Sequence, residues 1–226
     1  MLYNTVGLIS SLMFLGCLFG LVKQYQQIGH RKRQNKSPGF ATQSLSVNGF
    51  FSSFIGFYAF FVYAIMLDPI DYYLFVTRLL AATMTISILY AIFIDRVQLS
   101  QKIPLLVAIF AMFLACICLG WRSEYLHLGR PIASGLTLIA TVVMVQGSVS
   151  QIRKINREKS TGALSKSMNL IFMCKDLSNL AFGLVLDFSD GYPLILLGSC
   201  SAILKAVVLY QFRIYRLNPK GSGLFR

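Results

Sequence analysis

The chain has 226 residues, of which 56% are hydrophobic and only 13% charged, whereas a soluble domain carries about 25% charged residues, so an ordinary soluble fold is excluded. The net charge of +13 would suit nucleic acid, but the basic residues lie in short loops between long apolar runs, which is typical of a membrane protein and argues against a nucleic-acid partner. The sequence contains no metal-spaced histidine pair, no Gly-x-Ser-x-Gly and no phosphate-binding glycine loop, so we expect neither an enzyme nor a cofactor or metal site.

Seven segments are long and apolar enough to span a bilayer, for which a helix needs about 20 mostly apolar residues. They lie at about 4–27, 44–66, 72–94, 103–121, 131–152, 166–186 and 193–214. We therefore expect an all-α membrane protein with seven transmembrane helices. Pro104, Pro131 and Pro193 are expected at the starts of the fourth, fifth and seventh helices, where a missing N–H has no helical acceptor to lose. The five cysteines fall within these segments and are expected to be small buried side chains.

The loops between the segments differ in charge. Those on one side are rich in lysine and arginine and hold Arg31, Lys32, Arg33, Lys36, Arg96, Lys102, Arg153, Lys154, Arg157, Lys159, Arg213, Arg216 and Lys220. Those on the other side hold Arg122 and Arg130 against Asp68, Asp71, Glu124, Asp187 and Asp190. Because basic loops stay in the cytoplasm, the C-terminus is predicted to be cytoplasmic and the N-terminus outside or lumenal. A bacterial inner membrane and a eukaryotic organelle membrane both fit this pattern.

Short motifs recur in the same order in the two halves of the chain, which indicates an internal repeat. The matched pairs are Leu67-Asp68-x-x-Asp71-x-Tyr73 with Leu186-Asp187-x-x-Asp190-x-Tyr192, Lys36-Ser37-x-Gly39 with Lys159-Ser160-x-Gly162, and Leu89-Tyr90 with Leu209-Tyr210. We predict a three-helix repeat at 1–94, a linker helix within 95–130, and a second three-helix repeat with a short tail at 131–226. A single linking helix gives both repeats the same orientation, so the 3+1+3 arrangement consists of two parallel bundles.

Gln151-Ile152 followed by Lys159-Ser160-Thr161-Gly162, set within this 3+1+3 pattern, resembles the PQ-loop repeat family. That family includes SWEET-type sugar transporters, amino-acid exporters such as cystinosin and, more distantly, the KDEL receptor. The resemblance covers nearly the whole chain, and it is specific in the second copy and loose in the first, at Gln27-Ile28. It implies two bundles that give alternating access to a midplane site between the second and sixth helices. Two repeats in one chain complete such a pore, so a monomer would suffice.

The sequence also departs from the sugar-transporting relatives. The proline of the Pro-Gln pair is absent before both Gln27 and Gln151, and we expect no hinge proline inside any span. Glycines such as Gly16, Gly20 and Gly183 would serve flexibility or close helix packing. Sugar-transporting relatives often place a stacking tryptophan at the position of Asn179. The resemblance therefore favours amino acids over sugars as the cargo.

Ionisable side chains within a membrane cost about 2.5–3.5 kcal/mol each on insertion scales, so they are candidates for function. Lys175 and Asp176 lie near the middle of the sixth segment and Lys205 near the middle of the seventh, while Arg78 in the third is placed to extend its stem outward. One lysine is expected to pair with Asp176 and the other to meet a solute carboxylate or phosphate. The alternatives left open are an ion pair that only fixes helix packing and a proton-coupling role for Asp176.

A polar cleft is predicted between the second and sixth helices, with Asn48, Ser52 and Tyr58 on one and Asn169, Lys175, Asp176 and Asn179 on the other. Together with Lys205 these are the predicted solute-binding residues. Gln27 and Gln151 are expected at the ends of the first and fifth helices, either as a gate or as plain helix caps. The function predicted is transport of a small polar or charged solute, with protons as an open second partner. A KDEL-receptor-like sorting receptor and a PQ-loop protein that has lost transport remain the alternatives.

Overall fold

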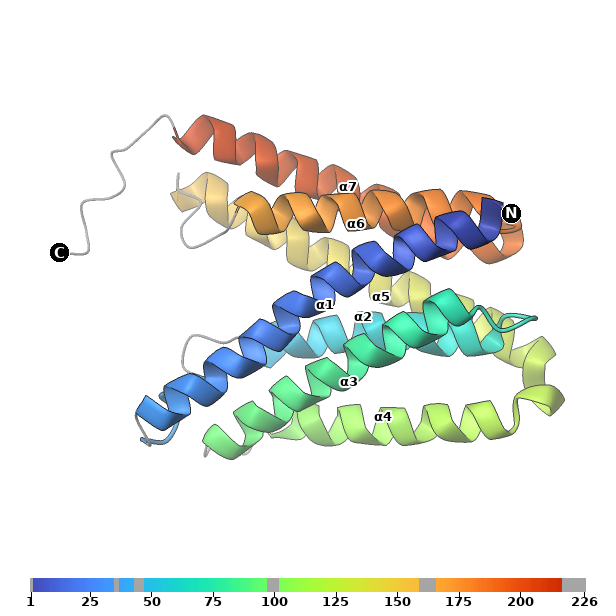
Figure 1. Ribbon diagram of the computed structural model, residues 1–226, viewed down its shortest axis with the longest axis horizontal. Coiled ribbons are helices and arrows are strands. Elements are labelled where there is room, and N and C mark those ends of the chain that lie inside the picture. Colours follow the sequence, from blue (N-terminus) through green and yellow to red (C-terminus); the bar gives the residue numbers. More distant parts are fainter. Residues whose placement is uncertain (1, 35–36, 43–46, 97–101, 159–165, 217–226) are drawn as a thin grey trace. The chain divides into compact units, whose positions relative to one another are not determined.

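The computed structural model describes residues 2–34, 37–42, 47–96, 102–158 and 166–216. Within these ranges the chain forms seven helices and no strand (Figure 1). The helices are α1 (Leu2–Gln34), α2 (Val47–Met66), α3 (Tyr72–Asp95), α4 (Ile103–Gly120), α5 (Arg122–Glu158), α6 (Lys166–Val185) and α7 (Phe188–Arg216). Each contains most of one predicted segment, so the prediction of an all-helical chain is confirmed.

Six of these helices are long and apolar enough to cross a bilayer, which makes the chain a multi-pass membrane protein. The helix that does not meet this measure among those described is α6. It has the required length, but Lys175 and Asp176 interrupt its apolar run. Among the described helices, the one that falls short of this measure is therefore the one that carries Lys175 and Asp176.

Two helices extend beyond the ends of their apolar segments, and this corrects the predicted positions of two glutamines. α1 continues to Gln34 and α5 to Glu158, so Gln27 and Gln151 lie inside helices rather than at their ends. Arginine, lysine, glutamine and glutamate make up most of the polar flanking stretches and are good helix formers, so the helices continue past the apolar runs.

Two helices, α5 and α7, also begin earlier than predicted, and this changes the position of two prolines. Pro131 lies inside α5 and Pro193 inside α7, whereas both were predicted at helix starts. Only Pro104, in the first turn of α4, has the predicted position. Each internal proline removes one backbone hydrogen bond, which transmembrane helices tolerate when neighbouring groups satisfy the freed carbonyl. The expectation that no span contains an internal proline is therefore wrong.

The chain divides into two compact units. One comprises residues 1–13 and 141–226, and the other comprises residues 14–140. Both α1 and α5 contribute residues to the two units. The units are defined by spatial contacts rather than by sequence similarity, so the repeat boundaries predicted at residues 94 and 131 remain a prediction.

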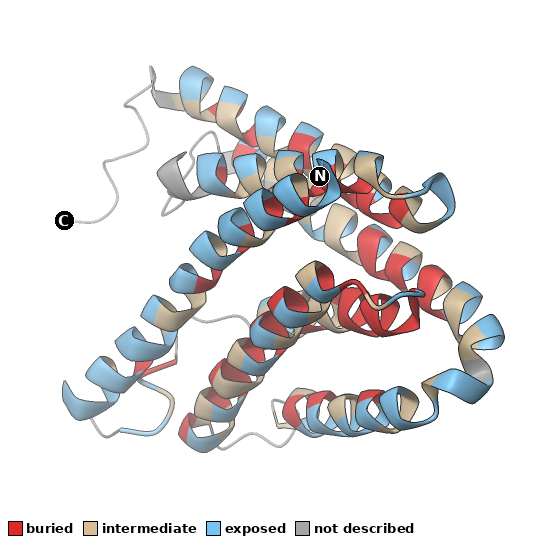
Figure 2. Cartoon of the chain, turned by 45° about the vertical axis from the view of Figure 1, so that its right-hand side comes forward, coloured by how far each residue is buried: buried red, intermediate tan, exposed pale blue. Residues whose placement is uncertain are grey.

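The unit of residues 14–140 is built on α2 and α3, which pack along one another, with α4 against both. Its core contains fully buried side chains such as Phe54, Ile88 and Ile92. In contrast, α4 buries only Leu105, Ala108 and Ala115, and much of the helix is exposed (Figure 2). Large apolar side chains such as Phe110 and Phe113 are among its exposed residues. An exposed apolar surface of this extent suits contact with lipid or with another apolar surface.

The cysteines differ from the prediction that they are buried. All five are free thiols, Cys116 and Cys174 are exposed, and the remaining three are partly exposed. Their apolar context placed them within membrane helices but did not show which helix face they occupy. On the lipid-facing side of a helix a thiol is as acceptable as any small apolar group.

Arg122, at the start of α5, holds the end of α2. Its Nε donates to the carbonyl of Ile65 at 2.7 Å, and a terminal nitrogen donates to the carbonyl of Leu67 and pairs with Asp68 at 3.2 Å. The last carbonyls of a helix lack helical partners and carry partial negative charge, so a guanidinium satisfies and stabilises them. The charge pattern of the loops predicted that Arg122 lies on the side opposite the basic loops, but it did not predict this contact.

Replacing Arg122 with methionine should lower the free energy of unfolding by about 1.5–3 kcal/mol, because hydrogen bonds from a charged donor to the backbone are lost. Asp68 is the matched control, since its side chain is 64% exposed and exposed ion pairs contribute little. Thermal unfolding in detergent should therefore show a clear loss for Arg122→Met and almost none for Asp68→Asn. Equal losses would mean that the exposed ion pair, rather than the carbonyl contacts, stabilises this corner.

The segment before α2 is fastened to the end of α3. Thr42, which is fully buried, donates from both its N–H and its hydroxyl to Asp95, and Arg96 donates to the Thr42 hydroxyl at 3.0 Å. Gly39 has a φ of 79° and donates its N–H to the Asp95 carbonyl at 2.8 Å. A glycine adopts this left-handed conformation without strain. Gly39, the last residue of the Lys-Ser-x-Gly motif, therefore lies in a turn.

The unit of residues 1–13 and 141–226 is dominated by the close packing of α6 against α7. A Cβ added at Gly191 would meet the Gly183 carbonyl oxygen at 2.0 Å, and one at Gly198 would meet the Asp176 carbonyl oxygen at 2.9 Å. Small residues allow the two backbones to approach this closely. The approach brings the middle of α7 against the part of α6 that carries Asp176.

Candidate functional site

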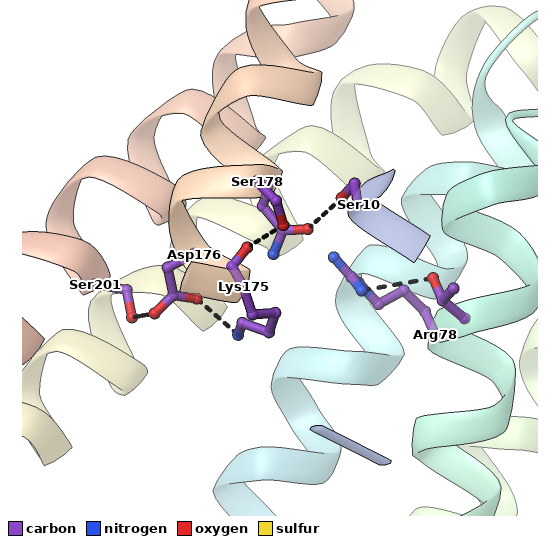
Figure 3. Close-up of polar contacts among 8 residues, drawn as sticks. Ser10, Arg78, Lys175, Asp176, Ser178 and Ser201 are labelled. Carbon is purple, nitrogen blue, oxygen red and sulfur yellow. Dashed lines mark hydrogen bonds and ion pairs between the residues drawn. The ribbon is translucent and has the colours of Figure 1, made fainter. Parts of the chain in front are cut away.

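Asp176 is the centre of a polar cluster in the middle of α6. Its side chain is buried, with the residue only 1% exposed, and both carboxylate oxygens have partners (Figure 3). One oxygen forms an ion pair with the Lys175 ammonium at 2.6 Å, and the other accepts a hydrogen bond from the Ser201 hydroxyl on α7. A buried carboxylate needs such partners, since desolvation otherwise disfavours the charged form.

The two lysines of this cluster approach one aromatic ring. The ammonium of Lys175 lies 5.9 Å from the centroid of the Phe172 ring and that of Lys205 lies 5.6 Å from it. Lys205 is close enough to Asp176 and Lys175 to interact electrostatically with both. A cation within about 6 Å of a ring is attracted to its face, so Phe172 is a shared neutral partner for both ammonium groups.

Asn179 links the cluster on α6 to the first helix, α1. It is 2% exposed, and its side-chain carbonyl accepts a hydrogen bond at 3.0 Å from the hydroxyl of Ser10 on α1 (Figure 3). Asn169, ten residues earlier on α6, is 6% exposed. The polar face predicted for this helix is therefore turned inward, as a bilayer requires of polar side chains that are not to meet lipid.

The structure thus brings together five of the predicted solute-binding residues in one compact unit, namely Asn169, Lys175, Asp176, Asn179 and Lys205. The three predicted on α2 belong to the other unit. Asn48 is exposed, Ser52 is partly buried, and Tyr58 is partly buried and stacks on Phe54 at 5.7 Å between ring centroids. A cleft shared by α2 and α6 therefore stays a prediction.

The predicted gate residues are also placed differently from one another. The side chain of Gln27 is exposed, whereas its neighbour Ile28 is buried in the core. The backbone of Gln151 is helical, but its side chain and the turn from Lys159 to Gly162 lie outside the described residues. A role for the two glutamines as helix caps is excluded by their position inside α1 and α5, while the gate remains a prediction.

Arg78 on α3 does not extend outward as the sequence suggested. The residue is 3% exposed, and its guanidinium stacks on the Phe14 ring with 3.8 Å between the guanidinium carbon and the ring centroid. Phe14 in turn packs edge-on against Phe57, with centroids 5.8 Å apart. Arginine is suited to this position because its flat, weakly hydrated guanidinium stacks on aromatic faces.

Three members of the cluster around Asp176 were missed by the sequence reasoning. Ser10, Phe172 and Ser201 carry no charge, and serine and phenylalanine are ordinary residues of a membrane helix. One signal was present for Ser201, which lies four residues before Lys205 and therefore on the same helix face. No sequence signal pairs Ser10 with Asn179, because the two are 169 positions apart.

A second polar contact joins the far ends of α5 and α7. The Gln211 side-chain nitrogen donates to the Ile152 carbonyl at 3.2 Å and to the Asn156 side-chain oxygen at 2.9 Å, and the Tyr215 hydroxyl donates to the same Asn156 oxygen at 3.0 Å. This contact fixes the two helices relative to one another within their unit. It was also not foreseen, because a lone glutamine near a helix end resembles an interfacial residue.

Comparison with known proteins identifies the fold. No family model and no curated protein matches the chain. Among solved structures, that of a eukaryotic SWEET transporter is similar, with a TM-score of 0.67 and 15% sequence identity over 96% of this chain and 100% of that chain. The two chains thus share a fold over almost their whole lengths while differing at most positions of the sequence.

Proposed function

We propose that the protein transports a small polar or charged solute across a membrane by alternating access. The fold likeness to a SWEET transporter supports this proposal. In the proposed arrangement α6 is a seventh span despite its charges, α4 links two parallel three-helix repeats, and the C-terminus is cytoplasmic. The repeats and the linker would have the boundaries predicted from the sequence.

The observation that carries the proposal is the buried Asp176–Lys175 ion pair with Ser201 in the middle of α6. Placing two ionisable groups in a membrane helix costs about 5–7 kcal/mol on insertion scales. Apolar residues at both positions would pack the same helices without that cost. Retention of the charges is therefore better explained by a solute or a proton than by helix packing.

The cargo is proposed to be an amino acid in preference to a sugar. Asn179 lies where the sugar-transporting relatives often place a stacking tryptophan, and its carbonyl is engaged with Ser10. The only tryptophan of the chain, Trp121, ends α4 with 62% of its surface exposed, which suits an interfacial anchor. Charged groups around Asp176, rather than a broad ring, are available to recognise the solute.

Counterflow in proteoliposomes tests this function. Liposomes are preloaded with an unlabelled amino acid, and entry of the same labelled amino acid is followed with and without a pH gradient. We expect accumulation with the wild-type protein and loss of it with folded Asp176→Asn, while glucose exchanges poorly. A dependence on the pH gradient that disappears in Asp176→Asn would assign proton coupling to this carboxylate. Solute binding without any counterflow would instead favour a receptor, and neither binding nor counterflow would refute the proposal.

A further inference from the structure

The charges around Asp176 do not cancel. Asp176 contributes one negative charge, and Lys175 and Lys205 contribute two positive charges. The carboxylate is already engaged on both oxygens, by the Lys175 ammonium and by the Ser201 hydroxyl. The cluster therefore has one positive charge in excess, and the group that could compensate a second ammonium is occupied.

Lys205 carries this excess charge. Its ammonium lies 5.6 Å from the Phe172 ring centroid, and it forms no hydrogen bond or ion pair with any other residue that the structure describes. Lys205 lies one helical turn after Ser201, so both side chains project from the same face of α7 toward α6. A ring is a weak partner for an ammonium, worth about 0.5–2 kcal/mol, and it does not replace an anion.

A solute that is bound here meets donors rather than acceptors. The ammonium of Lys205 offers three N–H groups, and the Phe172 ring beside it offers an apolar face. A solute ammonium would compete with Lys175 and Ser201 for Asp176 and would be repelled by both lysines. A neutral polyol would leave the charge of Lys205 without a counterion.

We propose that this site recognises the carboxylate of a small monoanionic solute, that the carboxylate pairs with Lys205, and that the apolar part of the solute lies against Phe172. The inference rests on the proposed function and specifies its substrate class. An amino acid is then held through its carboxylate, and its ammonium group weakens binding because both lysines repel it. A monocarboxylate should bind more tightly than the amino acid with the same carbon chain.

Four solutes with a similar short chain test this, namely propionate, alanine, ethylamine and 1-propanol. Binding is measured by isothermal titration with the purified protein in nanodiscs of phosphatidylcholine, which carries no net charge and so supplies no anionic lipid. We expect propionate to bind at least ten-fold more tightly than alanine, and ethylamine and propanol not to bind measurably. Inorganic phosphate is included as a second small anion and is expected to compete weakly, because it has no apolar part for Phe172.

Lys205→Met removes the charge and keeps the chain length, and Lys205→Arg keeps the charge. We expect a loss of at least ten-fold in propionate affinity for Lys205→Met and partial retention for Lys205→Arg. Lys166→Met is the matched control, because Lys166 is exposed at the start of α6 and should leave binding unchanged. Thermal unfolding of each variant shows whether it is folded, and a Phe172→Leu variant supplies a second test if Lys205→Met does not fold.

The possible results separate this inference from the proposed function. Counterflow of alanine that survives Lys205→Met, with equal affinity for alanine and propionate, would overturn the inference and leave transport intact. Phosphate binding as tight as that of propionate would overturn the assignment to carboxylates. The absence of binding and of counterflow for every solute would overturn both.

Discussion

Replacing Asp176 with alanine is expected to lower the free energy of unfolding by about 3–5 kcal/mol, because it leaves the Lys175 ammonium buried without its counterion. Ser201 loses its acceptor at the same time. The loss should appear as a large drop in the midpoint of thermal unfolding in detergent. It is the largest electrostatic effect that we expect from a single substitution in this chain.

A double variant and a surface control make this expectation specific. Replacing both partners, Lys175→Met with Asp176→Leu, should cost much less than the two single substitutions added together, since no unpaired charge remains. Glu124→Ala is the control, because Glu124 is exposed and its removal should change stability by less than about 0.5 kcal/mol. The ion pair is not structurally important if Asp176→Ala is as stable as Glu124→Ala.

The double variant also separates stability from function. It should fold and yet fail to exchange any solute, because the cluster has lost two of its three charged groups. A double variant that is stable and retains full counterflow would show that the ion pair serves helix packing only. The sequence had left open this alternative, in which the ion pair has no role in solute or proton recognition.

Replacing Gly191 with alanine should be the most damaging steric change. The added Cβ would lie 2.0 Å from the Gly183 carbonyl oxygen, which belongs to the backbone and cannot rotate away as a side chain would. The helix pair α6 and α7 must then separate or slide, which costs at least the roughly 1–3 kcal/mol typical of overpacking. We expect low expression or a strongly reduced midpoint of thermal unfolding.

Gly20→Ala is the matched control, since a Cβ at Gly20 meets nothing within 4 Å and the residue lies in the exposed part of α1. Alanine is favoured over glycine in a helix by about 0.8–1 kcal/mol, so this variant should be as stable as the wild type or more so. Solute binding is a second measure of this packing, because a shift of α7 moves Ser201 away from Asp176. A Gly191→Ala protein with unchanged stability and unchanged solute binding would contradict the close approach.

The residues of α6 show which features of the site could be predicted from the sequence. Its charges and amides were predicted to form one polar face, and Asn169, Asp176 and Asn179 are indeed all buried. The reason is the cost of exposing such groups to lipid, which depends on residue type and helical spacing alone. The same reasoning did not find the limits of α1 and α5, because it followed the apolar run rather than the helix propensity of the polar residues beyond it.

The glycines show a feature that could not be predicted from the sequence. Gly16, Gly20 and Gly183 looked equivalent in the sequence as candidates for flexibility or close packing. In the structure a Cβ at Gly16 or Gly20 would meet nothing, while one at Gly183 would lie 3.0 Å from the Gly191 carbonyl oxygen. Whether a glycine is needed depends on what the facing helix places opposite it, and a single sequence does not contain that information.

The sequence by itself determined that this is a helical membrane protein with charges in its sixth and seventh helices, because apolar length and the cost of buried charge are properties of each segment alone. The tertiary structure decided that Lys175, and not Lys205, pairs with Asp176, that Ser201 completes the pair, and that Arg78 stacks on Phe14 instead of reaching outward. These choices depend on how closely two helices approach and how each is rotated about its axis. Packing across long sequence separations sets both quantities, and so the same buried charges are compatible with several partners until the helices are in place.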